Sequence, residues 1–139
     1  MTIPAQIRKP VPETEVEGGK KTILIYSPDL NFCFSLSMLF QDRYNVITTT
    51  SIGSVDKFVA DYSADLVLID AVPSDKLLER IDLLKQIKQD LPMILLYVYN
   101  ARDVELDKAI RAHVSAVFYK PFEVSAVSQR IQDLLTPRP

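Results

Sequence analysis

Residues 65–70 of the chain read DLVLID, and this stretch decides the fold. Four consecutive apolar residues between two aspartates are too few for a membrane span and too uniformly apolar for a half-exposed strand. The stretch therefore predicts a central parallel strand that is buried on both faces. In open α/β sheets the functional groups gather beyond the carboxyl ends of the strands, which is where Asp70 emerges. A carboxylate there costs desolvation free energy unless neighbours compensate it, so Asp70 is either a functional group or a cap of the following loop.

Four further short apolar runs predict strands at 22–26, 45–50, 93–97 and 116–119. Helical spacing of apolar residues predicts helices at 31–44, 54–62, 75–89, 100–112 and from Pro121 to the last apolar residues. The side chains expected to face the core include Phe32, Leu36, Leu39 and Phe40 in the first helix, Leu77, Ile81, Leu84 and Ile87 in the third, and Val124, Val127, Ile131 and Leu134 in the last.

Strand and helix thus alternate five times, which predicts an α/β domain with a five-stranded parallel sheet between two helical layers. The strand order expected for five such units is 2-1-3-4-5. In that order the carboxyl ends of the strands meet at one edge of the sheet. The side chains expected at this edge are those of Ser27, Asp29, Asp70, Tyr97 and Lys120.

The composition limits the kinds of partner that the protein can have. Its 16 basic and 18 acidic residues are interspersed along 139 residues, so no basic face for nucleic acid is expected. The single cysteine, Cys33, permits neither an intrachain disulfide nor a cysteine metal site, and its apolar surroundings predict a buried side chain. The first residues contain no apolar run of the kind found in signal peptides, and no segment approaches the length of a membrane helix, so we expect no membrane association and a cytoplasmic location.

The first twenty residues differ in composition from the rest of the chain. Three prolines, a glutamate-rich patch and a Gly-Gly pair predict a disordered N-terminal tail at residues 1–20. The remaining residues, 21–136, are predicted to form one domain.

Three segments together resemble a response-regulator receiver domain: residues 65–70, the strand LPMILL at 91–96, and the turn YKPF at 119–122. The resemblance implies the flavodoxin-like, doubly wound (βα)5 fold and a signalling role in a two-component phosphorelay. It also implies that Asp70 accepts a phosphoryl group from a histidine kinase, that Lys120 pairs with the phosphoryl oxygens, and that the bond between Lys120 and Pro121 is cis. A carboxylate that attacks an anionic phosphoryl group needs such a positive charge nearby. Without this role, Lys120 would be a solvated lysine at a strand end.

The sequence departs from this family where metal would bind. The family holds Mg²⁺ with two adjacent acidic residues after the first strand, and here these positions are Ser27 and Pro28. Asp29, one residue farther along, is either a partial substitute that would share the metal with Asp70 or a solvent-facing turn residue. We therefore expect no cofactor, or only weak Mg²⁺ binding.

Further departures lie around the predicted phosphorylation site. Tyr97 stands where the family has a small hydroxyl residue, so its ring either reaches a phosphoryl oxygen or roofs the site. Val117 stands where the family has the switch aromatic, and Pro73 arrives early in a loop that lacks the usual glycine. Together these changes predict a degenerate receiver.

Three functions remain open at this stage. The preferred one is a phosphorylation-independent interaction module, not an enzyme, that docks a histidine kinase or a downstream signalling protein through its last helix and fifth strand and could dimerise there. The second is a working phosphoacceptor at Asp70. The third is a small-ligand binder, which would need a phosphate cradle that residues 27–30 do not provide.

Overall fold

The computed structural model describes residues 20–136, which form five strands and five α-helices that alternate along the chain. The strands are β1 (Thr22–Tyr26), β2 (Asn45–Thr49), β3 (Leu66–Asp70), β4 (Met93–Tyr97) and β5 (Ala116–Tyr119). The helices are α1 (Leu30–Phe40), α2 (Val55–Tyr62), α3 (Asp75–Ile87), α4 (Val104–His113) and α5 (Val124–Leu135). The tail predicted at residues 1–20 falls, except for Lys20, outside the described residues.

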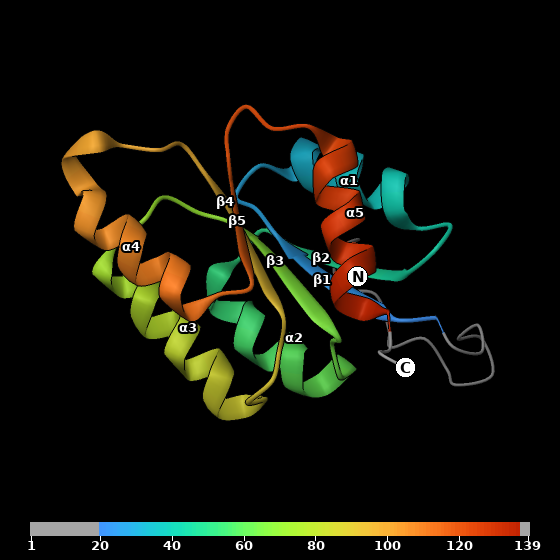
Figure 1. Ribbon diagram of the computed structural model, residues 1–139. Helices are drawn as coiled ribbons and strands as arrows, with labels where there is room; N and C mark the ends of the chain where they lie inside the picture. Colours follow the sequence, from blue (N-terminus) through green and yellow to red (C-terminus); the bar gives the residue numbers. More distant parts are fainter. Residues whose placement is uncertain (1–19, 137–139) are drawn as a thin grey trace.

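The strands make one parallel sheet in the order β2-β1-β3-β4-β5, as predicted (Figure 1). β3 lies at the centre, where residues Leu66 to Ile69 have no solvent exposure. β4 is buried along its whole length as well. Strands covered on both faces must be apolar throughout, which is why DLVLID and MILLY both lack the alternation of a half-exposed strand.

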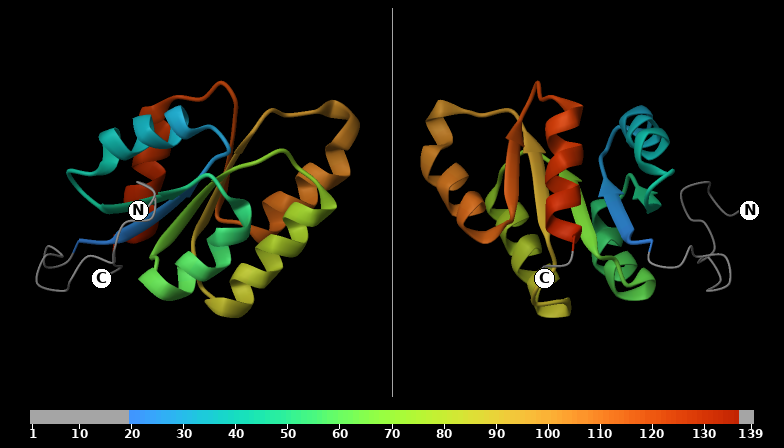
Figure 2. Two further views of the ribbon diagram at one scale, coloured as in Figure 1. Left: turned by 180° about the vertical axis from the view of Figure 1, so that it is seen from behind. Right: turned by 45° about the vertical axis from the view of Figure 1, so that its right-hand side comes forward.

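Helices cover the sheet on both sides, with α1 and α5 on one face and α2, α3 and α4 on the other (Figures 1 and 2). Each face has its own core. Leu36 and Phe40 of α1 pack with Val127 and Ile131 of α5 in one core. The other core contains Val55 and Phe58 of α2, Leu77, Ile81 and Leu84 of α3, and Ile110 of α4.

Several predicted details are wrong at the level of single residues. The last helix begins at Val124 rather than at Pro121, and the first ends at Phe40 rather than at residue 44. Leu39, Ile87 and Val124 were expected in the core but are 52%, 44% and 37% exposed. In α1 the buried positions are Cys33, Leu36 and Phe40, so the face turned to the sheet excludes Leu39. The expected burial of Cys33 is confirmed.

Two helices begin where the sequence supplies a capping side chain. The carboxylate of Asp29 accepts hydrogen bonds from the first backbone amides of α1, and the hydroxyl of Ser74 accepts one from Leu77 at the start of α3. No helix within residues 20–136 is long and apolar enough to cross a membrane.

Candidate functional site

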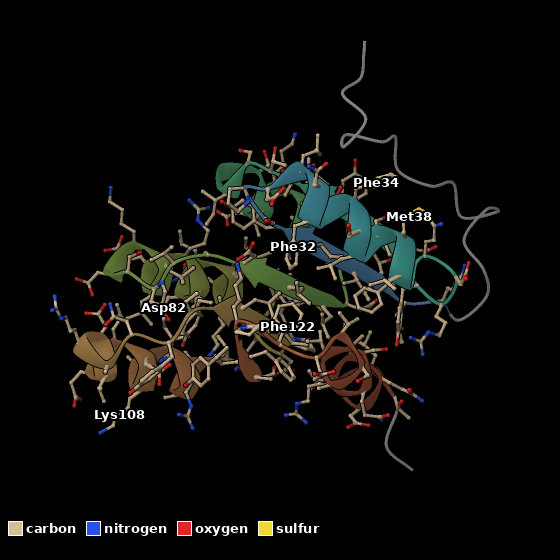
Figure 3. The ribbon with its side chains drawn as sticks, turned by 90° about the horizontal axis from the view of Figure 1, so that it is seen from above. Phe32, Phe34, Met38, Asp82, Lys108 and Phe122 are labelled. Carbon is tan, nitrogen blue, oxygen red and sulfur yellow. The ribbon has the colours of Figure 1, made fainter. Side chains whose placement is uncertain are left out.

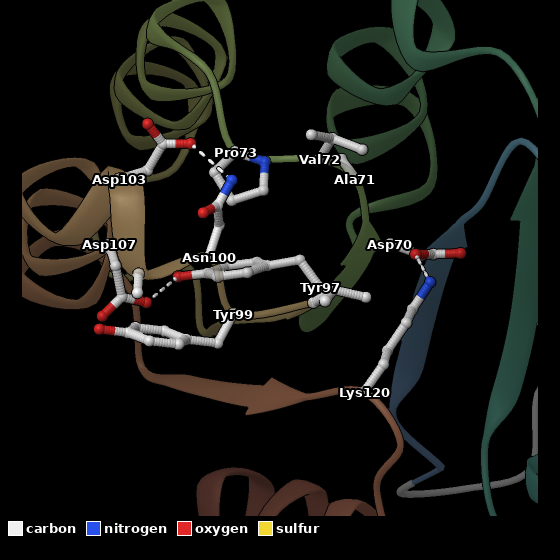
Figure 4. A pocket seen from close by; sticks show the side chains of 12 residues that line it. Asp70, Ala71, Val72, Pro73, Tyr97, Tyr99, Asn100, Asp103, Asp107 and Lys120 are labelled. Carbon is white, nitrogen blue, oxygen red and sulfur yellow. Dashed lines mark hydrogen bonds and ion pairs between the residues drawn. The ribbon is translucent and has the colours of Figure 1, made fainter.

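Asp70 and Lys120 meet at the carboxyl edge of the sheet, as the strand order requires. Asp70 ends the buried central strand and is only 7% exposed. Lys120 directly follows β5, after which the Lys120–Pro121 peptide bond is cis, as the resemblance implied. The ammonium group of Lys120 forms an ion pair with Oδ1 of Asp70 (Figure 4). The pair brings together the two residues on which the phosphoryl-transfer hypothesis depends.

Ser27 binds the second oxygen of Asp70. This serine follows β1 and is fully buried, and its hydroxyl donates a 2.7 Å hydrogen bond to Oδ2 of Asp70. The same hydroxyl oxygen accepts a 3.0 Å hydrogen bond from the backbone N–H of Asp29. Both carboxylate oxygens of Asp70 therefore have a partner within the protein, which offsets much of the cost of burying the charge.

An aromatic ring also borders the ammonium group of Lys120. Nζ of Lys120 lies 5.6 Å from the centroid of the Phe32 ring in α1, a distance at which a cation is attracted to the ring face. Phe32 in turn contacts the Phe122 ring edge to face, with their centroids 6.3 Å apart (Figure 3). Lys120 is thus held between a carboxylate and an aromatic pair.

The position of Asp29 bears on metal binding. Its carboxylate accepts hydrogen bonds from Asn31 N at 2.9 Å and from Phe32 N at 3.3 Å, so it is engaged at the start of α1. The remaining oxygen donors beside Asp70 include the hydroxyl of Ser27, while the Pro28 side chain offers none. Mg²⁺ prefers near-octahedral oxygen coordination that includes carboxylates, and this donor set does not fit it. Both hydrogen bonds are made to Oδ1 of Asp29, so metal binding through this residue would fall to its other oxygen, Oδ2.

The hydroxyl of Tyr97 points away from Asp70. It donates a 2.8 Å hydrogen bond to Oδ1 of Asp107 in α4, and Figure 4 shows the ring extended toward that helix. Burial raises the pKa of Tyr97, and the hydrogen bond to Asp107 raises it further. A phosphoryl-binding role for Tyr97, which stays a prediction, would require this bond to break.

Asp107 is a buried residue that sequence reasoning missed. It is 5% exposed and also accepts hydrogen bonds from the hydroxyl of Tyr119, at 2.9 and 3.0 Å to its two oxygens. Nη1 of Arg111, one helical turn farther on, lies 3.6 Å from Oδ2 of Asp107. The signal for this cluster was present, since an aspartate occupies a core-facing helical position between Val104 and Ile110.

A cleft of about 390 Å³ lies between these two polar clusters. It separates the loop after β3 from the segment that joins β4 to α4 (Figure 4). Its lining comprises Asp70, Ala71, Val72, Pro73, Tyr97, Val98, Tyr99, Asn100, Ala101, Asp103, Asp107 and Lys120. Val72, Val98 and Tyr99 are exposed at its border, so apolar contact area surrounds the Asp70–Lys120 pair.

No protein-family model and no curated protein sequence matches this chain. Solved structures do match it closely in fold. A protein from Burkholderia pseudomallei described as pilus assembly-related is 25% identical, with 87% of this chain and 96% of that chain covered and a TM-score of 0.67. A protein from Burkholderia thailandensis described as a pilus assembly protein is 26% identical, covers 82% and 97% of the two chains, and has a TM-score of 0.67.

Response-regulator receiver domains match equally well in structure. A receiver domain protein from Methanospirillum hungatei aligns with a TM-score of 0.73 over 84% of this chain and 94% of its own, at 19% identity. A receiver domain from Bacteroides fragilis aligns with a TM-score of 0.70 over 86% and 99% of the two chains, at 20% identity. The chain therefore has the fold of response-regulator receiver domains.

Proposed function

We propose that this chain is a receiver-like signalling module that acts by protein–protein interaction without efficient phosphorylation of Asp70. Its partner would be a histidine kinase or a downstream signalling protein, and the chain itself would not be an enzyme. The observation that carries this proposal is the neighbourhood of Asp70. Its two oxygens are bound by Lys120 and by the buried hydroxyl of Ser27, and Asp29, the carboxylate in the loop after β1, caps α1 through its Oδ1.

The charge around Asp70 supports this proposal. Phosphoryl transfer concentrates negative charge on the oxygens around the attacked phosphorus, and proteins stabilise that charge with cations held close to the nucleophile. Here the single negative charge of Asp70 is balanced by the single positive charge of Lys120, so little electrostatic attraction remains for a dication. The site is therefore stable in its unphosphorylated form and poorly equipped for phosphoryl transfer.

The likeness to two pilus-related proteins supports an adaptor role. At 25% and 26% identity, these two proteins are described as pilus assembly-related and as a pilus assembly protein. The exposed Val72, Val98 and Tyr99 beside the Asp70–Lys120 pair provide apolar surface for binding other proteins. The predicted contact through α5 and β5 stays a prediction.

Incubation with a small phosphodonor and Mg²⁺, followed by intact-mass measurement, tests the proposal. We expect no mass gain in the wild-type chain under conditions that label a phosphorylatable receiver completely. The matched variant is Ser27→Asp with Pro28→Asp, which restores two carboxylates next to Asp70 and should allow some labelling. A gain of one phosphoryl group in the wild-type chain that disappears in Asp70→Asn would refute the proposal.

The same experiment decides the alternative function, a working phosphoacceptor. One observation favours that alternative: Asp70 and Lys120 are in contact at the edge where phosphoryl chemistry would take place. A working switch also requires that labelling change the affinity for the partner. Partner binding that is equal before and after treatment with the phosphodonor would support the interaction module instead.

A further inference from the structure

The cleft at the carboxyl edge of the sheet has apolar walls. Residues 71–73, in the loop after β3, are alanine, valine and proline, and Val98 lines the cleft from the segment between β4 and α4. Val72 and Val98 are exposed, and so is the ring of Tyr99 beside them. A side chain with an apolar stem can therefore be buried between these walls.

Charged side chains lie at the two ends of the cleft. Figure 4 shows Asp70 and Lys120 at one end and Asp103 and Asp107 at the other. Among the described residues that line the cleft, Lys120 alone is basic, and it is already paired with Asp70. An anionic occupant would therefore meet carboxylates at both ends without a free cation to bind it.

Asp103 is a carboxylate of this cleft that has no cationic partner among the described residues. It directly precedes α4, but its side chain makes no capping hydrogen bond there. The side-chain amide of Asn100 donates a 3.4 Å hydrogen bond to Oδ2 of Asp103. No basic side chain within residues 20–136 forms an ion pair with Asp103, and its neighbour Arg102 is exposed and does not line the cleft. A neutral apolar occupant would remove water from this carboxylate without replacing it, which costs free energy.

We propose that the cleft receives an arginine side chain of a partner protein, with its stem between the apolar walls and its guanidinium group at Asp103. The inference rests on the proposed function as an interaction module and names one contact that the partner makes. An arginine avoids both costs, because its stem is apolar and its head supplies the cation that Asp103 lacks. Guanidinium groups also stack on aromatic rings, so the exposed ring of Tyr99 favours arginine over lysine.

Titration of the full chain with hexylguanidinium chloride, followed by NMR, tests this inference. The probe has the apolar stem and the cationic head of an arginine side chain. At millimolar probe we expect saturable shifts in the backbone amide signals of Val72, Val98, Tyr99 and Asp103. Hexylurea has the same stem with a neutral head, and hexanoate has an anionic head, so both should bind about threefold or more weakly.

Three variants locate the probe in the cleft. Asp103→Asn should weaken hexylguanidinium binding about threefold, the usual effect of losing one exposed ion pair. The matched control is Glu105→Gln, which removes an exposed carboxylate of α4 that does not line the cleft and should bind the probe like the wild type. Val98→Lys places a second ammonium group in the cleft and should weaken binding more than Asp103→Asn does. Positions 98 and 103 are exposed, so these variants should keep the circular dichroism spectrum of the wild type.

Three outcomes would overturn the inference. Equal affinity for hexylguanidinium, hexylurea and hexanoate would mean that the apolar stem alone decides binding. Shifts confined to the exposed apolar residues of α1 would place the probe outside the cleft. Unchanged binding in Asp103→Asn would exclude this carboxylate as the partner of the guanidinium group. The titration uses the unmodified chain and no phosphodonor, so its failure would leave the labelling test of the proposed function unaffected.

Discussion

The buried hydroxyl of Ser27 donates a 2.7 Å hydrogen bond to Oδ2 of Asp70. The group that approaches Asp70 at this position is thus neutral. A carboxylate in the same place would repel the carboxylate of Asp70, and a cation would be needed to neutralise the two charges. The contact satisfies one oxygen of the buried carboxylate with a neutral donor. It also links β1 to β3 at the edge of the sheet where the candidate site lies.

The first prediction concerns magnesium. Because Ser27 and Pro28 supply no carboxylate, millimolar Mg²⁺ should leave the melting temperature of the wild-type chain nearly unchanged. Ser27→Asp with Pro28→Asp adds two negative charges beside Asp70, which should lower stability without metal and make the protein respond to Mg²⁺. Thermal unfolding with and without Mg²⁺ measures both effects.

The control for this experiment is the same double variant with Asp70→Asn added. It removes the carboxylate that a bound ion would share, so the response to Mg²⁺ should shrink. Clear stabilisation of the wild-type chain by millimolar Mg²⁺ would mean that Asp29 takes part in binding the metal, and would favour the phosphoacceptor alternative.

The second prediction concerns the ion pair. Lys120→Met keeps the stem of the side chain but leaves the buried Asp70 with Ser27 as its remaining side-chain partner. We expect a loss of about 1–3 kcal/mol in the free energy of unfolding, less than for a fully buried pair because the Lys120 side chain is 36% exposed. Urea denaturation measures this change.

Asp70→Asn provides the comparison for Lys120→Met. The amide keeps the shape of the carboxylate and leaves no buried charge, so it should cost less than Lys120→Met. In the double variant the cost of Lys120→Met should largely disappear, since no buried anion remains. Equal costs of Lys120→Met with and without Asp70 would contradict an energetic role for the pair.

The third prediction concerns Asp107. Asp107→Leu removes the acceptor of two tyrosine hydroxyls, and the hydroxyl of the buried Tyr97 would lose its partner. We expect a loss of about 2–3 kcal/mol in the free energy of unfolding. Tyr97→Phe should cost less, about 1 kcal/mol, because Tyr119 continues to bind Asp107. An Asp107→Leu variant at least as stable as the wild type would contradict this prediction.

The fourth prediction concerns alkaline pH. Burial and the bond to Asp107 raise the pKa of Tyr97 above the ordinary value of 10.0. The folded state therefore holds this proton more tightly than the unfolded state does. The resulting stabilisation is fully present below pH 10 and is lost as the pH rises through the pKa of the folded state.

Unfolding measured at several alkaline pH values tests this prediction. Tyr97→Phe should lose stability less steeply above pH 10 than the wild-type chain does. Some decline should remain, because burial also raises the pKa values of Tyr26 and Tyr119. Identical pH slopes for the two proteins would contradict the assignment to Tyr97.

The sheet could be predicted from the sequence because its central strands are short apolar runs that alternate with helical segments. The four apolar residues of DLVLID and the strand MILLY show no alternation of apolar and polar residues, which argues against a half-exposed strand and favours cover on both faces. Short connections and alternation with helices then leave few arrangements of the strands. The contact between Asp70 and Lys120 follows from that arrangement. Asp70 ends β3 and Lys120 directly follows β5, and the carboxyl ends of these parallel strands lie at the same edge of the sheet.

The orientation of α1 could not be predicted in the same way. Apolar residues occur almost all around this helix, so periodicity does not identify the side that faces the sheet, and Leu39 was assigned to the core in error. The hydrogen-bond partners of the Ser27 and Tyr97 hydroxyls could not be predicted from the sequence either. The hydroxyl of Ser27 bonds to Asp70, which lies 43 residues farther along the chain. The hydroxyl of Tyr97 bonds to Asp107, which lies on a different element, α4.

The cluster of Tyr97, Tyr119 and Asp107 should also make the tyrosine fluorescence of the protein sensitive to the position of α4. The chain has no tryptophan and six tyrosines, so its near-ultraviolet signals come mainly from tyrosine. Two of those six rings bond to one carboxylate on α4, and they lie 5.8 Å apart. Any event that moves α4 off the sheet must release both hydroxyls together, and the unmodified protein would signal that movement in its own fluorescence.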